Sequence, residues 1–171
     1  MSESQPGSTP DPDGAPESGE RVFLVVVDDS EEMPVALKFA ARRAKRTGGR
    51  VALFYVAERA DFQHWASVGD LMRAEAREEG ERLLQKLATE VHTWSGGYPV
   101  LYLREGDIRE ELITLIEEEP TISILVLAAS VGGGGPGPII SYLLGKKARQ
   151  NRIPITIVPG NLSDEQIIQI T

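Results

Sequence analysis

Residues 122–146 constrain the fold of this chain more than any other stretch. Residues 122–127 form an almost uninterrupted apolar run, ISILVL, which predicts a parallel β-strand that is buried on both faces. Five glycines and one proline follow at 132–137, and a helix is predicted to begin at Pro138 or Ile139, because proline fits the first helical turn. A strand, a glycine-rich turn and a helix N-terminus together form a backbone cradle that suits an anion. The sequence therefore predicts either a phosphate-binding loop or a flexible turn.

Predicted strands and helices alternate along the rest of the chain. Apolar runs predict strands at 21–27, 50–56, 98–103 and 152–158, and helical periodicity predicts helices after Ser30 and at 70–94, 108–119 and 138–150. This order predicts an α/β fold with an open parallel sheet and helices on both faces. Ligands of such sheets bind beyond the carboxyl ends of the strands, where the strand order reverses. If the first strand is central and the fourth lies beside it, Asp28 meets the glycine loop.

Local signals predict how the helices begin. Asp107 is placed to cap the helix at 108–119, with Glu110 in a capping-box position three residues later. Residues 163–166, SDEQ, predict a second capping box and a short helix in the tail at 161–171. Asp28 and Asp29 suit Mg²⁺ beside a phosphate, but Asp29 and Ser30 also suit the cap of the following helix, and we expect the cap rather than a metal site.

Composition limits the classes of protein to which the chain can belong. Its 171 residues suit one domain at 21–160, and the absence of cysteine excludes disulfides, thiol catalysis and zinc–thiolate sites. Residues 1–20 contain five acids and neither Lys nor Arg, which predicts a disordered acidic tail. The remaining chain is mildly acidic, so no nucleic-acid partner is expected. Without a membrane-spanning run or a secretory signal, we expect a cytoplasmic protein that has no membrane partner.

The glycine loop departs from two common nucleotide-binding templates. A dinucleotide fingerprint belongs to the first strand–helix turn, which here reads VVVDDSEE. A Walker loop requires Ser or Thr after its Gly-Lys pair, but position 147 is lysine. Because the glycine loop fits neither template, it requires a different one. The sequence also shows no pair of a nucleophile and a base.

Five segments in order resemble the universal stress protein family. They are VVVDDSEE after the first strand, LFYV, REGD, the glycine loop through LLGKKARQ, and PITIVPG, and they span about 21–160. The resemblance implies a Rossmann-like sheet of five strands in the order 3-2-1-4-5 and a homodimer, often formed along the last strand. For this chain we expect the homodimer to form through the last strand and the C-terminal tail. Many members bind ATP through G-x-x-G-x9-G-[ST], whereas others lack this motif and bind no ATP.

The resemblance also implies a set of nucleotide-binding positions. Asp28 matches the family aspartate after the first strand, and Val56 matches the position whose backbone contacts adenine. Counting back from Gly145 places Gly135 and Gly132 at the glycine positions of the family motif. Lys146 then stands where the motif has its final Ser or Thr. The implied site comprises Asp28, Val56, Gly132, Gly135, Gly145 and Lys146.

Two features of the loop differ from the family pattern. If the family motif is aligned on the fourth strand instead of on Gly145, its first glycine falls at Ala128. The loop of this chain is then four residues longer than the family loop. Pro136 and Pro138 also remove two N–H donors from the cradle. Three functions remain open: a non-catalytic stress-response regulator that binds ATP or AMP, a slow ATPase, and a nucleotide-free dimeric interaction module. We favour the first, because no catalytic base or metal pair is visible.

Overall fold

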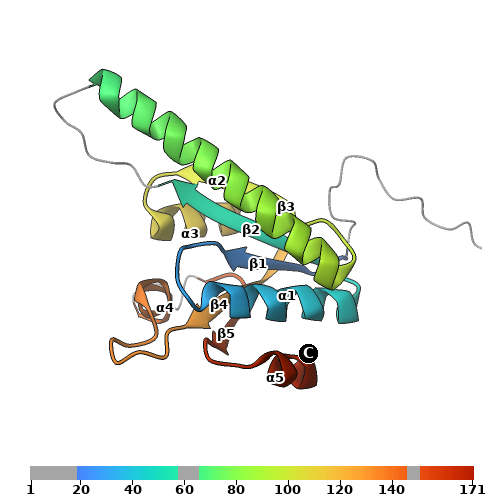
Figure 1. Cartoon of the computed structure of the whole chain (residues 1–171). Coiled ribbons are helices and arrows are strands. Elements are labelled where there is room, and N and C mark those ends of the chain that lie inside the picture. Colours follow the sequence, from blue (N-terminus) through green and yellow to red (C-terminus); the bar gives the residue numbers. More distant parts are fainter. Residues whose placement is uncertain (1–18, 58–65, 146–150) are drawn as a thin grey trace, which may run out of the picture.

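The computed structural model describes residues 19–57, 66–145 and 151–171 (Figure 1). Strands and helices alternate in the order β1 (Val22–Val26), α1 (Met33–Thr47), β2 (Arg50–Ala57), α2 (Ala66–Ser95), β3 (Val100–Glu105), α3 (Ile108–Glu118), β4 (Ile122–Ala129), α4 (Pro138–Leu144), β5 (Ile155–Pro159) and α5 (Asp164–Ile170). The strands form a parallel sheet in the order β3-β2-β1-β4-β5. This arrangement confirms the predicted α/β class and the strand order 3-2-1-4-5.

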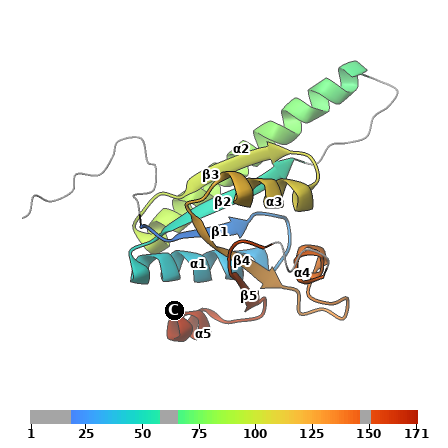
Figure 2. The same cartoon turned by 180° about the vertical axis from the view of Figure 1, so that it is seen from behind.

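Helices cover both faces of the sheet (Figure 2). Phe23 and Val25 of β1 belong to the apolar cluster that includes α1 and α2. Leu24 and Val26 of the same strand belong to the opposite cluster, which includes α3 and α4. All residues of β1 are buried, because this strand has a neighbour on each side and helices on each face. The central position of β1 explains the continuous apolar run at this point in the sequence.

Helix α2 begins at Ala66, four residues before the predicted start, and it packs closely on β2 at Gly80. A Cβ at Gly80 would lie 2.5 Å from Cε1 of Tyr55 and 3.0 Å from Cδ1 of Leu103. A helical glycine costs about 1 kcal/mol relative to alanine. Glycine is needed at this position despite that cost, because any larger residue would clash with the side chain of Tyr55. Within residues 19–57, 66–145 and 151–171, no helix is both long and apolar enough to cross a bilayer.

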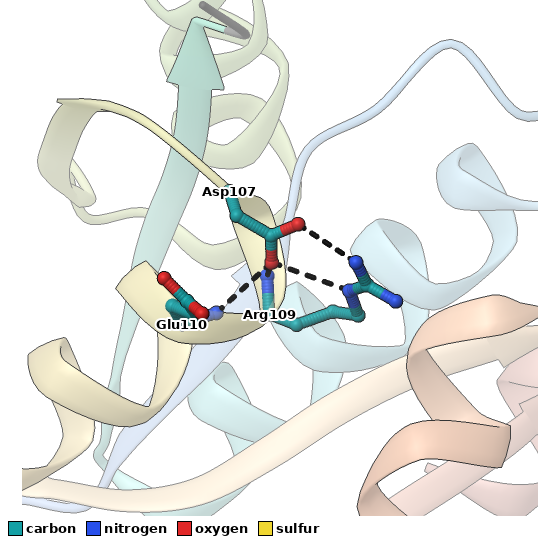
Figure 3. Close-up of polar contacts among 3 residues, drawn as sticks. All are labelled: Asp107, Arg109 and Glu110. Atoms are coloured by element: carbon teal, nitrogen blue, oxygen red, sulfur yellow. Dashed lines mark hydrogen bonds and ion pairs between the residues drawn. The ribbon is translucent and has the colours of Figure 1, made fainter.

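Asp107 closes the amino-terminal end of α3 (Figure 3). Its Oδ1 accepts hydrogen bonds from the backbone N–H groups of Arg109 and Glu110, at 2.9 and 3.3 Å. The Arg109 guanidinium lies 2.8 Å from the other carboxylate oxygen, and its hydrogen bonds lower the pKa of Asp107 to about 2. The predicted N-cap is therefore confirmed. The Glu110 side chain returns no hydrogen bond to Asp107, so α3 lacks the complete capping box that begins α5 at Ser163.

The fifth strand is shorter than predicted, because Arg152 has another role. Strand β5 begins at Ile155, three residues after the predicted start. The Arg152 guanidinium instead donates hydrogen bonds to the carbonyl oxygens of Ile116 and Glu119, at 2.6 and 3.1 Å. It thereby pairs the carbonyl of Ile116 in the last turn of α3, and it adds a second donor to the Glu119 carbonyl, which also accepts the Ile122 N–H. Helix α4 ends at Leu144, and the predicted extension over 146–150 lies outside the described residues.

Candidate functional site

A cavity of about 340 Å³ lies at the carboxyl ends of β1 and β4, where the strand order reverses. Asp28, Ser30 and Glu32 line it from the connection between β1 and α1, and Ser130 lines it from the end of β4. Residues 134–138 contribute the glycine loop. The cavity also has an apolar wall, which consists of Val26, Met33, Ala36, Leu127, Ile139 and Ile140. The topology therefore brings together segments that are about a hundred residues apart in the sequence.

The turn after β1 holds Asp28 in place. Asp28 Oδ1 accepts hydrogen bonds from the Ser30 backbone N–H at 3.0 Å and from the Ser30 hydroxyl at 2.5 Å. Helix α1 then begins at Met33, with Glu32 as its N-cap residue and no side-chain capping bond. The prediction that Asp29 and Ser30 cap this helix is therefore wrong. The Ser30 hydroxyl donates to Asp28 instead, and the chain makes a further turn before the helix begins.

The glycine loop combines left-handed backbone with unpaired donors. The φ angles of Gly135 and Gly137 are +92° and +110°, a conformation that residues with a side chain rarely adopt. The Ser130 N–H donates to the carbonyl oxygen of Pro136 at 3.3 Å, which closes the loop on itself. The N–H groups of Gly134 and Gly137 donate no hydrogen bond to any described residue. Since both glycines line the cavity, these donors remain available to a ligand.

The positions implied by the family resemblance do not all lie together. Asp28 and Gly135 line the cavity. Gly132 lies outside the lining, and its N–H donates to the Ser130 hydroxyl at 3.4 Å. Val56 is 6% exposed and belongs to the core cluster that includes α3 and α4, outside the cavity lining.

The last two implied positions follow α4. The Gly145 N–H donates to the carbonyl oxygen of Ser141 at 3.1 Å, as expected of a residue that ends a helix. Lys146 lies outside the described residues. The structure thus brings together Asp28 and Gly135 at the cavity. It places Val56 in the core, Gly132 elsewhere in the loop and Gly145 at the end of α4, all outside the cavity lining.

Sequence analysis did not identify Glu32 as a residue of the cavity. A Cβ at Gly160 would overlap the Glu32 side chain and would lie 2.6 Å from the carbonyl oxygen of Ala129. Gly160 therefore allows the end of β5 to approach the start of α1. The Pro159-Gly160 pair is a turn signal in the sequence, but it does not reveal which side chain this turn will contact.

The polar side chains of the cavity are two carboxylates and two hydroxyls. The carboxylates of Asp28 and Glu32 can accept hydrogen bonds from hydroxyl or amino groups of a ligand, and the glycine N–H groups can donate to its oxygen atoms. The cavity can therefore hold a ligand with an apolar ring, hydroxyl or amino donors, and an oxygen-rich group. Among the residues that the structure describes, no three His, Cys, Asp or Glu side chains are grouped closely enough to hold a metal ion.

Comparison with known proteins matches most of the chain to one family. The model of the universal stress protein family matches residues 20–159. No curated protein matches the chain. Among solved structures, universal stress protein UspA from Lactobacillus plantarum is 17% identical, with 83% of this chain and 99% of that chain covered and a TM-score of 0.68.

Two further structures have titles that name a ligand. A universal stress protein in complex with cAMP is 19% identical, with 84% of this chain and 100% of that chain covered and a TM-score of 0.51. A universal stress protein family protein from Arabidopsis thaliana with AMP bound is 13% identical, with 85% of this chain and 94% of that chain covered and a TM-score of 0.56. At these identities, the likeness establishes a shared fold.

Proposed function

The chain belongs to the universal stress protein family, and on that premise we propose that it is a non-catalytic regulatory protein that binds an adenine nucleotide, AMP or ATP. The proposed site is the cavity between β1 and β4. One observation carries the proposal: Gly134 and Gly137, whose N–H groups have no partner among the described residues, line the same cavity as Asp28. The cAMP and AMP complexes of two proteins with this fold support the same ligand class.

Each part of the cavity has a role in this proposal. The apolar wall, which includes Val26 and Leu127, packs against the base. Ser30 binds Oδ1 of Asp28, so the second carboxylate oxygen accepts a hydrogen bond from the ligand. The loop N–H groups donate to phosphate oxygens, as backbone donors do in other phosphate-binding loops. Gly135 gives the loop the left-handed turn that this geometry requires.

Calorimetric titration with AMP and with Mg-ATP tests the proposal. We expect saturable binding and no formation of ADP. An Asp28→Ala variant should bind at least about tenfold more weakly, equivalent to about 1.4 kcal/mol. Asp29→Ala is the matched control, because Asp29 is an exposed neighbour that does not line the cavity. No heat and no thermal shift at millimolar nucleotide would contradict the proposal, and formation of ADP would indicate an ATPase instead.

We also propose that the protein is a homodimer that associates through β5. Strand β5 lies at one end of the sheet order, and such an edge offers unpaired backbone groups to a second copy. The side chain of Ile157 on this strand is 38% exposed, so the strand presents apolar surface that a second copy could cover. Sedimentation equilibrium should show a dimer that Ile157→Lys converts to a monomer. Leu71→Lys on α2, at a site 61% exposed, should leave the dimer intact. A monomeric parent protein would contradict this assignment.

A further inference from the structure

Glu32 lines the cavity, and its charged group has no evident structural role. It is the N-cap residue of α1, yet its side chain makes no capping hydrogen bond. The side chain is half-buried and lines the cavity. Within the described residues, the carboxylate has no hydrogen-bond partner and no ion-pair partner. The charge of Glu32 is therefore not neutralised by any described residue, and it adds to the negative charge of the cavity lining.

Gly160 holds the stem of this side chain in place. A Cβ at Gly160 would lie 2.7 Å from Cβ of Glu32 and would overlap its Cγ. The Gly160 N–H also donates to the carbonyl oxygen of Ala129 at 3.0 Å, which fixes the end of β5 against β4. The backbone at Gly160 therefore packs directly against the Cβ and Cγ atoms of Glu32.

Asp28 places a second carboxylate on the same cavity. Ser30 occupies only one of its oxygen atoms, and both Asp28 and Glu32 line the same cavity. That space is small. Its volume of about 340 Å³ is near the lower end of the range of roughly 300–1,000 Å³ that small-molecule sites span.

We propose that Glu32, together with Asp28, restricts this cavity to nucleosides and nucleoside monophosphates and disfavours nucleoside triphosphates. The inference rests on the proposed nucleotide site. The hydroxyl groups of a ribose and the amino group of an adenine donate hydrogen bonds that carboxylates accept. Each further phosphate adds negative charge that the same carboxylates repel. This repulsion is stronger in a partly enclosed cavity than in bulk water, because the effective dielectric constant is lower.

Parallel calorimetric titrations with adenosine, AMP and ATP test this inference. They are performed on the full chain in EDTA at low ionic strength, so that no divalent cation neutralises the phosphates. We expect AMP to bind at least about tenfold more tightly than ATP, a difference of about 1.4 kcal/mol. Glu32→Gln keeps the size of the side chain and removes its charge. This variant should reduce the ratio of AMP affinity to ATP affinity at least about fivefold, since it removes one of two repelling charges.

Glu31→Gln is the matched control, because it removes the same charge from an exposed neighbouring residue that does not line the cavity. It should leave the ratio of AMP to ATP affinity unchanged. High salt provides a second control: in 1 M NaCl the Debye length is about 3 Å, so the preference of the parent protein for AMP should shrink. Thermal unfolding of each variant verifies that it folds.

The outcomes separate this inference from the proposed function. ATP binding as tight as AMP binding would overturn the inference and leave the nucleotide site standing. Equal effects of Glu32→Gln and Glu31→Gln would also overturn it, because the selectivity would then reflect overall charge. Failure of adenosine, AMP and ATP to bind would overturn both the inference and the proposed function.

Discussion

Two turns of this molecule connect a strand to a helix in opposite ways. Between β3 and α3, Asp107 accepts hydrogen bonds from the N–H groups of Arg109 and Glu110, and the Gly106 N–H donates to the carbonyl oxygen of Ala57. Between β4 and α4, the N-cap residue is Gly137, which has no side chain with which to cap the helix. The donors of the first turn are therefore paired. In the second turn, the N–H groups of Gly134 and Gly137 have no partner among the described residues, and both glycines line a cavity.

This difference separates a turn that stabilises the fold from one that is available for binding. Both turns lie at the carboxyl edge of the same sheet, so topology alone would allow a ligand at either. In the α3 turn a carboxylate occupies the place that an anionic ligand would take. In the α4 turn that place is empty of side chains, because glycine occupies four of the five positions that precede Pro138. Changes in the first turn should therefore alter stability without altering nucleotide affinity, whereas changes in the second should alter nucleotide affinity.

The largest expected effect is loss of binding in Gly135→Val. Gly135 has φ +92°, where a β-branched residue is strained. We expect nucleotide affinity to fall about 100-fold or more, equivalent to about 2.8 kcal/mol, and the unfolding free energy to fall by about 1–2 kcal/mol. Gly133→Ala is the control, because its φ is not positive and nothing lies within 4 Å of the added Cβ. Full affinity of Gly135→Val in calorimetry would show that this loop is not the binding element.

The next largest effect should come from Arg152→Met, which opens the carboxyl end of α3. Arg152 donates to the carbonyl oxygens of Ile116 and Glu119. Hydrogen bonds that involve a charged group contribute about 1.5–3 kcal/mol, so chemical denaturation should show a loss of about 2 kcal/mol with nucleotide affinity retained. Lys86→Met removes an exposed cation from α2 and should have little effect. Equal losses in both variants would contradict the capping role.

Asp107→Ala removes the side chain that closes the α3 turn. Loss of an N-cap residue costs about 1 kcal/mol, and we expect this loss in denaturation experiments without a change in nucleotide affinity. Asp29→Ala, in the turn after β1, is the matched control, because Asp29 caps no helix. A loss of binding in Asp107→Ala would remove the distinction between the two turns.

Asp107 should also make the free energy of unfolding depend on pH. The pKa of Asp107 is about 2 in the folded protein, below the usual value of about 3.9 for an unfolded chain. Its ionised form therefore stabilises the fold fully above about pH 4, and this contribution disappears as the pH falls toward about 2. Asp107→Asn keeps a capping oxygen but does not titrate. In urea denaturation between pH 5 and pH 2, the parent protein should lose more stability than this variant, and parallel curves would contradict the assignment.

The smallest expected effect concerns the contact between the two helices that follow these turns. The Arg109 guanidinium lies 5.6 Å from the centre of the Tyr142 ring on α4. Cation–π contacts at exposed sites contribute about 0.5–1 kcal/mol. A double-mutant cycle with Arg109→Ala and Tyr142→Leu should give a small favourable coupling between the two side chains. A coupling of zero would show that the closed turn does not support α4.

The sequence predicted the features of these turns that depend on short segments. Apolar runs identified the strands, and the spacing from Asp107 identified the α3 cap, because both signals are local. The place of Glu32 depends on a close approach by Gly160, which is distant in the chain. Val56 lies in the core rather than in the cavity lining, since its strand pairs with β1 and β3 while the cavity opens between β1 and β4. Such long-range contacts leave no periodic pattern in a single sequence.

Amide NMR during titration with AMP measures both turns at once. If the α4 turn binds nucleotide and the α3 turn only stabilises the fold, the N–H signals of Gly134 and Gly137 should shift progressively. The signals of Arg109 and Glu110 should remain in place, because their hydrogens are already bonded to Asp107. Shifts at Arg109 and Glu110, or unchanged signals at the two glycines in a solution that AMP saturates, would contradict the division between the two turns.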